Sequence, residues 1–154
     1  DFLYAGFPGM TRYAREYAKR RAPDGNMNRL YVVESTPSST GVKADNRLPL
    51  RTTEIESFVR VLAAGVGIEA GVNGWAGDRA GGKFLSAIVQ DLQNHRGSSV
   101  IIPGEHQSPT VHALVHGMNQ ALGNAGRTVV YTDPVNANPI NQTESLRDLV
   151  NDMR

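Results

Sequence analysis

The feature that most constrains this fold is a regular alternation of short apolar segments with longer amphipathic ones. The short segments are rich in β-branched and aromatic residues, which is typical of buried strands. In the longer segments, apolar residues recur at the three- and four-residue spacing of a helix. We therefore predict strands over residues 29–35, 98–104 and 127–133, and helices over residues 10–22, 53–66, 83–96, 108–126 and 141–153.

Strands that alternate with helices usually run parallel and are covered by helices on both faces. No linker or internal repeat divides the 154 residues. We therefore expect residues 1–154 to form one α/β domain. Its expected architecture is three-layer and Rossmann-like, with a mostly parallel sheet and helices on both faces.

Several helix ends carry recognisable signals. Thr53 and Glu56 have the spacing of a capping box. Ser108 is expected to cap a helix whose first residue is Pro109, and Asn141 to cap the last helix. The residues expected to face the core share helical spacing, and they are Ile55, Phe58, Val59, Leu62, Val66, Leu85, Ile88, Val89, Leu92, Val111, Leu114, Val115, Met118 and Leu122.

Composition excludes several classes of function. The 16 basic and 15 acidic residues give a net charge of +1, which leaves no electrostatic footprint for nucleic acid or for an acidic membrane surface. The chain has no cysteine, so it holds no disulfide, no thiolate zinc site and no cysteine-ligated iron–sulfur cluster of its own. No apolar run approaches the length needed to cross a bilayer, so we expect no direct membrane insertion.

Residues 34–50 form a long and mostly polar stretch between a predicted strand and a predicted helix. A loop of that length in a compact domain is usually functional, or else the assignment of the segment is wrong. In parallel sheets, ligands bind beyond the carboxyl ends of the strands. Because the stretch begins directly after Val33, it is a candidate ligand-binding edge.

Residues 68–82 are rich in glycine and predict a surface excursion. Within them, Gly77 to Lys83 match the spacing of a phosphate-binding loop, but Phe84 replaces the expected Ser or Thr, and no convincing strand precedes the motif. We therefore expect a flexible glycine loop there. Trp75 either anchors a neighbouring domain or packs on this domain's own surface.

Other groups of polar residues give no recognisable site. His112 and His116 are four residues apart on one helix, and only Glu105 and His106 could complete a metal site with them, so packing or capping roles are expected. The carboxylates of Glu34, Asp45 and Glu54 lack a convergent base or nucleophile. The hydroxyls beside them are expected to form turns, and they belong to Ser38, Ser39 and Thr40.

The stretch "YVVESTPSSTGVKADNRLPLR", residues 31–51, resembles a motif of the molybdopterin oxidoreductase (dimethyl sulfoxide reductase) superfamily. In that family a strand ends in Asp-Pro-Arg. Three further motifs follow it in order: Thr-x-Thr-Ala, then Ala-Asp, then Leu-Pro-Ile-Arg-Pro-Gly-Thr-Asp at the start of a helix. The matching residues here run without a gap, and they are Thr40, Ala44, Asp45, Leu48, Pro49 and Arg51.

A second stretch, "VIIPGEHQSPTVHALVHGMNQALGNAGRT" at residues 100–128, is similar to the family's strand, glycine, helix and Leu-x-Gly-Asn-x-Gly segment. The opening "DFL" and the later "YAREYAKRR" resemble the branch that fuses a molybdopterin-like region to an iron–sulfur protein. That branch includes the electron-transfer subunit of alternative complex III, a respiratory assembly that oxidises quinol. The resemblance, and the absence of an initiator methionine at Asp1, lead us to expect an interior piece of a larger protein.

The sequence also departs from the family at the residues that hold the pterin dinucleotide. Asp-Pro-Arg is replaced by Glu34, Ser35 and Thr36, and the longer side chain displaces the carboxylate. Pro-Gly-Thr-Asp is replaced by residues 52–55, so the glycine turn is lost and Ile55 stands where the second carboxylate is expected; a shift by one residue would put Glu54 there instead. We therefore expect a degenerate cofactor site, made of Glu34, Ser35, Thr40, Asp45, Arg51 and Glu54.

Three functional hypotheses follow. The first is a structural and assembling domain of a molybdopterin-oxidoreductase-like electron-transfer subunit, which is not itself catalytic and binds no cofactor. The second is a working cofactor domain, in which Glu34, Asp45 and Glu54 hold the pterin dinucleotide. The third is a freestanding nucleotide-binding module that uses residues 77–83.

For the first hypothesis, this chain binds no cofactor, and the resemblance implies molybdopterin guanine dinucleotide and iron–sulfur clusters elsewhere in the full protein. It also implies contacts with other domains of the same polypeptide and with subunits of a respiratory complex. The resemblance suggests that this complex is exported, faces the periplasm and is associated with the membrane. No nucleic-acid partner is expected.

Overall fold

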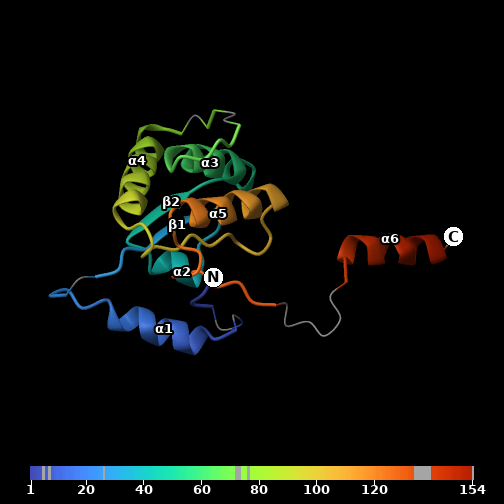
Figure 1. The fold of residues 1–154 in the computed structure, drawn as a ribbon, viewed down its shortest axis with the longest axis horizontal. Coiled ribbons are helices and arrows are strands. Elements are labelled where there is room, and N and C mark those ends of the chain that lie inside the picture. The colour runs from blue at the N-terminus through green and yellow to red at the C-terminus, as the bar shows by residue number, and fades with distance from the viewer. Residues whose placement is uncertain are drawn as a thin grey trace.

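The computed structural model describes residues 1–4, 6, 8–25, 27–71, 74–75, 77–133 and 140–153. They form a mixed α/β fold with a two-stranded parallel sheet (Figure 1). The elements in chain order are α1 (Met10–Lys19), β1 (Tyr31–Glu34), α2 (Ser39–Val42), β2 (Asn46–Pro49), α3 (Thr52–Gly65), α4 (Arg79–Asn94), α5 (Pro109–Ala121) and α6 (Gln142–Asp152).

The stretch predicted as a long polar loop holds an element of the sheet. Between residues 34 and 50 the chain forms α2 and then β2, so the interpretation of this stretch as one long loop is wrong. In the register of the sheet, Tyr31 pairs with Asn46 and Glu34 pairs with Pro49. β2 escapes a sequence search because its side chains are polar or exposed, apart from the buried Leu48.

The other two predicted strands are not strands. Among the described residues, 98–104 form no strand pairing, and 127–133 contribute one isolated bridge, between Ala125 and Val129. The first segment is held by a side chain instead. The Asn119 amide on α5 accepts from the Ile101 N–H at 3.1 Å and donates to the Ile101 carbonyl at 2.8 Å. This single side chain supplies the donor and the acceptor that a neighbouring strand would supply.

The core lies where α3 packs against α5, with the sheet and α4 alongside (Figure 1). The predicted apolar faces of α3 and α5 are confirmed, because Ile55, Phe58, Val59, Leu62, Val66, Val111, Val115, Met118 and Leu122 are all buried, and Leu114 packs against them. Trp75 packs its ring edge-on against Phe58, with the ring centroids 5.2 Å apart. Of the two roles left open for Trp75, the structure shows packing on its own domain.

Helix boundaries follow local chemistry, with four main corrections. α5 ends at Ala121 rather than at residue 126, because Gly123 adopts a positive φ of 69° just after the helix. α4 begins at Arg79 rather than at residue 83, because the Asp78 side chain accepts from the Gly81 N–H at 2.8 Å. α3 begins one residue earlier than predicted, and at its start the Glu54 side chain accepts from the Arg51 N–H, in place of the predicted pair Thr53 and Glu56. α1 ends at Lys19, before residue 22.

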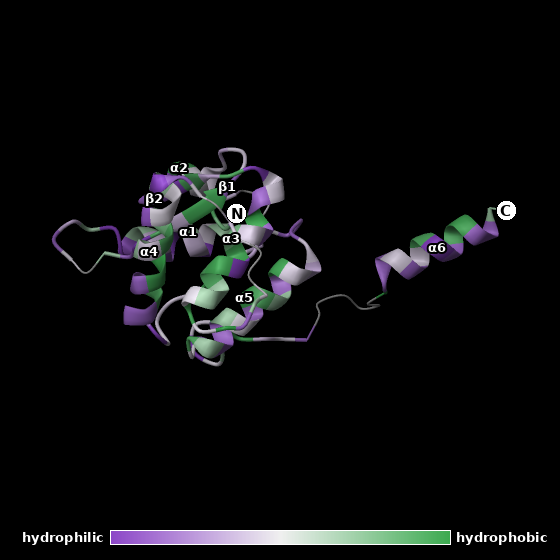
Figure 2. Ribbon diagram, turned by 90° about the horizontal axis from the view of Figure 1, so that it is seen from above, coloured by the Kyte–Doolittle hydropathy of each residue, from purple (hydrophilic) through white to green (hydrophobic). Residues whose placement is uncertain are grey.

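The predicted caps of the last two helices are confirmed. Ser108 accepts from the Val111 N–H at 3.4 Å, and Asn141 accepts from the N–H groups of Thr143 and Glu144. Within the described ranges, no helix combines the length and the apolar character that crossing a bilayer requires. α6 lies apart from the other elements in Figures 1 and 2, and none of its described residues is buried.

Candidate functional site

The candidate site is the carboxyl edge of β1, where the chain turns into α2. Glu34 is the last residue of β1, and its side chain is only 12% exposed. Its carboxylate accepts from Arg47 Nε at 2.6 Å and from the Ser38 N–H at 3.2 Å. Ser38 in turn caps α2, because its hydroxyl accepts from the Gly41 N–H at 3.0 Å.

Gly41 leaves room for the Glu34 carboxylate. A Cβ atom at position 41 would lie 1.9 Å from Glu34 Oε1, so any other residue would collide with the carboxylate. Gly41 itself is buried. The hydrogen-bond donors of Arg47 and Ser38 are therefore directed to the Glu34 carboxylate. This carboxylate fills the space that a side chain at position 41 would otherwise occupy.

The charge of Glu34 is stabilised in place. Burial raises the pKa of the Glu34 carboxyl, but hydrogen bonds from Arg47 and Ser38 outweigh burial and hold the pKa below its ordinary value. Arg47 was not identified from the sequence. Its position on β2, in a segment read as loop, concealed that it lies beside β1.

Asp45 lies at the opposite edge of the sheet from Glu34. It directly precedes β2, and Asn46, the next residue, pairs with Tyr31 at the start of β1. Its carboxylate receives two hydrogen bonds from Arg21, at 2.9 and 2.7 Å, and one from the Leu30 N–H at 2.8 Å. The hydrogen bond from Arg21 is the main reason that the pKa of Asp45 is lowered.

Thr40 and Ser35 contribute little to an open ligand surface. Thr40 is buried, and its hydroxyl and backbone N–H both contact the Asp1 carboxylate. The same hydroxyl accepts from the Leu3 N–H at 3.3 Å, so this residue ties the amino-terminal segment to α2. Ser35 is exposed and follows Glu34 directly.

Arg51 and Glu54 lie at the start of α3, just beyond the carboxyl end of β2. Glu54 Oε2 accepts from the Arg51 N–H at 3.0 Å and thereby satisfies one of the free donors at the helix start. The Leu50 N–H donates to the Glu34 carbonyl at 3.1 Å, which extends the sheet pairing to this point. Glu34, Arg51 and Glu54 therefore share one edge of the sheet, and Asp45 does not.

The phosphate-loop match at residues 77–83 lies mostly within α4. Residues 79–83 are helical, so the expectation of a flexible glycine loop is wrong for them. The start of this helix is occupied by the Asp78 carboxylate, in the position where a phosphate would bind. Of the residues described between 68 and 82, Ala70 and Gly81 are buried, and the excursion is therefore partly packed.

The histidine pair on α5 is not joined by further ligands. His116 Nδ1 lies 3.0 Å from the Tyr131 hydroxyl, and the two rings are in contact. Within the described ranges, no group of three acidic or histidine side chains could hold a metal ion.

Glu56, predicted as a capping residue, instead accepts from Arg60 and from the Ser108 hydroxyl at 2.8 Å, which links α3 to α5.

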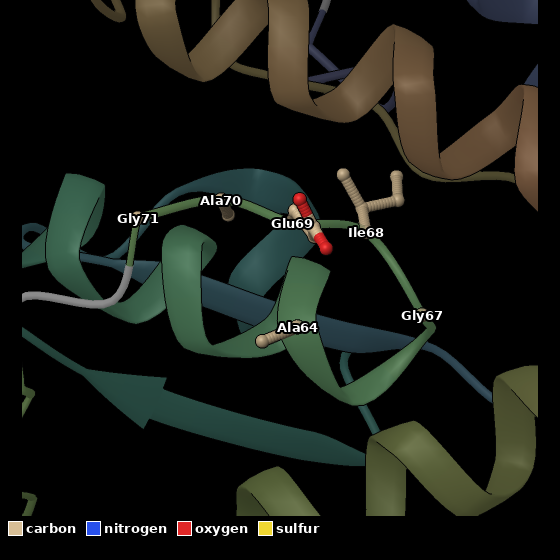
Figure 3. Close-up of a pocket in the computed structure, with 6 residues that line it drawn as sticks. All are labelled: Ala64, Gly67, Ile68, Glu69, Ala70 and Gly71. Atoms are coloured by element: carbon tan, nitrogen blue, oxygen red, sulfur yellow. The ribbon is translucent and has the colours of Figure 1, made fainter.

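A shallow hollow of about 420 Å³ lies at the carboxyl end of α3 (Figure 3). Six residues line it, and they are Ala64, Gly67, Ile68, Glu69, Ala70 and Gly71. Glu69 is the only one with a charged side chain. Ligand sites usually bring several polar groups together, so this hollow offers little chemistry.

The arrangement as a whole presents carboxylates that are already bound by arginines or backbone donors of the same chain. Glu34 is held by Arg47, Asp45 by Arg21, and Asp78 by the start of α4.

Comparison with known proteins assigns no relatives, because no protein-family model matches the chain and no curated protein matches it significantly.

Proposed function

We propose that this chain is a structural and assembling α/β domain of a molybdopterin-oxidoreductase-like electron-transfer subunit, of the kind found in alternative complex III. The similarity of residues 31–51 and 100–128 to that family supports the assignment. In this proposal the chain is an interior part of a larger polypeptide. Its partners are neighbouring domains and respiratory subunits of an exported, membrane-associated complex.

The observation that carries the structural role is the state of Glu34. Its carboxylate is bound by Arg47 and Ser38 and lies against Gly41, at the edge where the family binds the guanine end of its cofactor. A dinucleotide would have to displace these contacts. The residues present therefore do not fit the cofactor, and the site is degenerate in this proposal.

The proposed fold is three-layer and Rossmann-like. Two observations support it: β1 and β2 are parallel, and in Figure 1 they lie between α3 on one side and α2 on the other. Iron–sulfur clusters, which need thiolate ligands, belong to other parts of the polypeptide because this chain has no cysteine.

The test has two parts. The complete gene product, purified from its native host, is expected to contain iron and to lack molybdenum and pterin, as measured by elemental analysis and fluorescence of the oxidised pterin. In parallel, guanosine diphosphate is titrated into this chain as a probe for the guanine end of the cofactor, with binding followed by calorimetry. No binding is expected.

A matched pair of variants makes the second part decisive. Glu34→Gln changes the proposed contact, whereas Glu69→Gln makes the same chemical change at an exposed residue far along the chain. If guanosine diphosphate binds the unchanged protein and Glu69→Gln, but not Glu34→Gln, the domain holds the cofactor and the structural role is wrong. Molybdenum in the complete gene product would lead to the same conclusion.

A further inference from the structure

Two exposed apolar surfaces on this chain are not covered by any described residue. The first is the apolar face of α6, formed by Leu146, Leu149, Val150 and Met153. These side chains are between 43% and 78% exposed. Their spacing of three, four and seven residues places them on one side of the helix, and Figure 2 shows the apolar and polar residues of α6.

The second surface is an apolar strip formed by Val100, Ile102 and Val130, which are 49% to 72% exposed. In an extended segment alternate side chains point to opposite sides, so Val100 and Ile102 point away from Ile101, which packs on the core. Both segments run along α5.

The contacts that place the strip on α5 also bring its two segments together. Ile101 binds Asn119, and Tyr131 contacts His116 one helical turn away. The Thr128 hydroxyl donates to the Ser99 carbonyl and joins the two segments at one end.

Both surfaces need a partner, for separate reasons. α6 has eleven residues and no buried side chain, and an isolated helix of that length is marginal in water. The strip exposes three large apolar side chains to water, and a packed partner would bury them.

Charge makes the two surfaces complementary. Beside its apolar face α6 carries three acidic residues, Glu144, Asp148 and Asp152, against one arginine, Arg147. Beside the strip lie Arg96, which donates to the Ala121 carbonyl at the end of α5, and Arg127, which directly precedes Thr128. Both arginines lie at the end of the strip where Thr128 meets Ser99, whereas Asp133 follows the other end. The acidic helix therefore matches the basic end of the strip.

We propose that a second copy of this chain covers both surfaces, with α6 of each copy packed on the apolar strip of the other. α6 lies away from α5, the helix that contacts the segments of the strip, in both views (Figures 1 and 2). A two-fold axis would place α6 of each copy on the strip of the other. This inference does not rest on the proposed function, because both surfaces are defined by the chain itself.

Disulfide trapping tests which surfaces meet, because the chain has no cysteine of its own. A mixture of the single variants Leu149→Cys and Ile102→Cys, oxidised mildly, is expected to yield a disulfide between the two variants, identified by peptide mass. The control pairs Asn151→Cys, on the polar side of α6, with Ile102→Cys, and it is expected to cross-link far less. Equal cross-linking of both pairs would contradict the proposal.

The double variant Leu149→Cys/Ile102→Cys distinguishes two arrangements: α6 packed on the strip of a second copy, which we call exchange, and α6 packed on the strip of its own chain. Exchange gives disulfide-linked dimers at low protein concentration, whereas α6 folding onto its own strip gives an internal disulfide in a monomer. An internal disulfide as the main product overturns the proposal.

Sedimentation equilibrium measures the dimer directly. The unchanged chain is expected to dimerise, and Leu149→Asp to raise the dissociation constant roughly tenfold or more, since it places a charge in the centre of the interface. Asn151→Asp adds the same charge on the polar side and is expected to have little effect. A chain that stays monomeric, or a dimer unaffected by Leu149→Asp in a variant with an unchanged circular dichroism spectrum, would overturn the proposal.

Discussion

Sequence and structure disagree in opposite ways in two regions of the molecule. One region is the stretch of residues 34–50, and the other is the pair of segments at 98–104 and 127–133. The first looks like a loop and contains β2, while the other two look like strands and pair with neither described strand. β2 has a partner because the short crossover through α2 returns the chain beside β1. Whether an extended segment becomes a strand therefore depends on a backbone partner more than on its side chains.

The two regions also differ in what holds them. The turn at Glu34 is fixed by a charged side chain that receives donors from Arg47 and Ser38. The segment at Ile101 is fixed by a neutral side chain, Asn119, which is 2% exposed. Three substitutions probe this difference, and the largest effect is expected in the second region.

Replacing Asn119 by Ala should be the most damaging of the three. It removes both hydrogen bonds to Ile101 and one from Asn124, and it leaves buried groups without partners. We expect the free energy of unfolding to fall by about 3 kcal/mol, measured by urea denaturation. Gln120→Ala, on the exposed side of α5, is the control and should cost about 0.5 kcal/mol or less. Equal losses would mean that the side chain does not hold the segment.

Replacing Gly41 by Ala tests the space around Glu34. The new Cβ atom would meet the carboxylate, so we expect a loss of about 1–2 kcal/mol in the free energy of unfolding. Gly82→Ala is a matched control, because it lies in α4 with nothing within 4 Å of the new atom, and it should stabilise by about 0.5–1 kcal/mol. In a Glu34→Ala background, the loss at Gly41 should largely disappear. A loss that persists there would place its cause outside the carboxylate.

Replacing Glu34 by Gln should produce the smallest effect, and one that depends on pH. Because the folded-state pKa of Glu34 is lowered, its contribution to stability is complete above the unfolded pKa and is lost as the pH falls through the folded value. The unchanged chain should therefore unfold a few degrees above Glu34→Gln, by roughly 3 °C, at pH 7. The gap should close below about pH 4. A difference in unfolding temperature that does not change with pH would show that the charge of Glu34 is not the cause of the difference.

The sequence predicted most of the helical core. Apolar spacing located α3, α4 and α5 and their buried faces, and local chemistry located the caps at Ser108 and Asn141. These features could be predicted because they depend on residues within one or two turns of each other. The start of α4 was missed because the glycines before Lys83 concealed the cap at Asp78.

The candidate site was predicted only in part. The sequence located Glu34 and Glu54 at the edge of a strand, but it grouped them with Asp45, which lies at the opposite edge. Neither Arg47 nor Arg21 was identified as a partner, because each lies far along the chain from the carboxylate that it binds.

The sequence by itself therefore determined the helices, their apolar faces and the absence of any thiolate chemistry. Only the tertiary structure decided which extended segments pair, and which carboxylates are already bound within the chain. The physical reason is the range of the interactions. A helix closes its hydrogen bonds within four residues, whereas a parallel strand or a buried ion pair needs a partner that only the folded chain brings near.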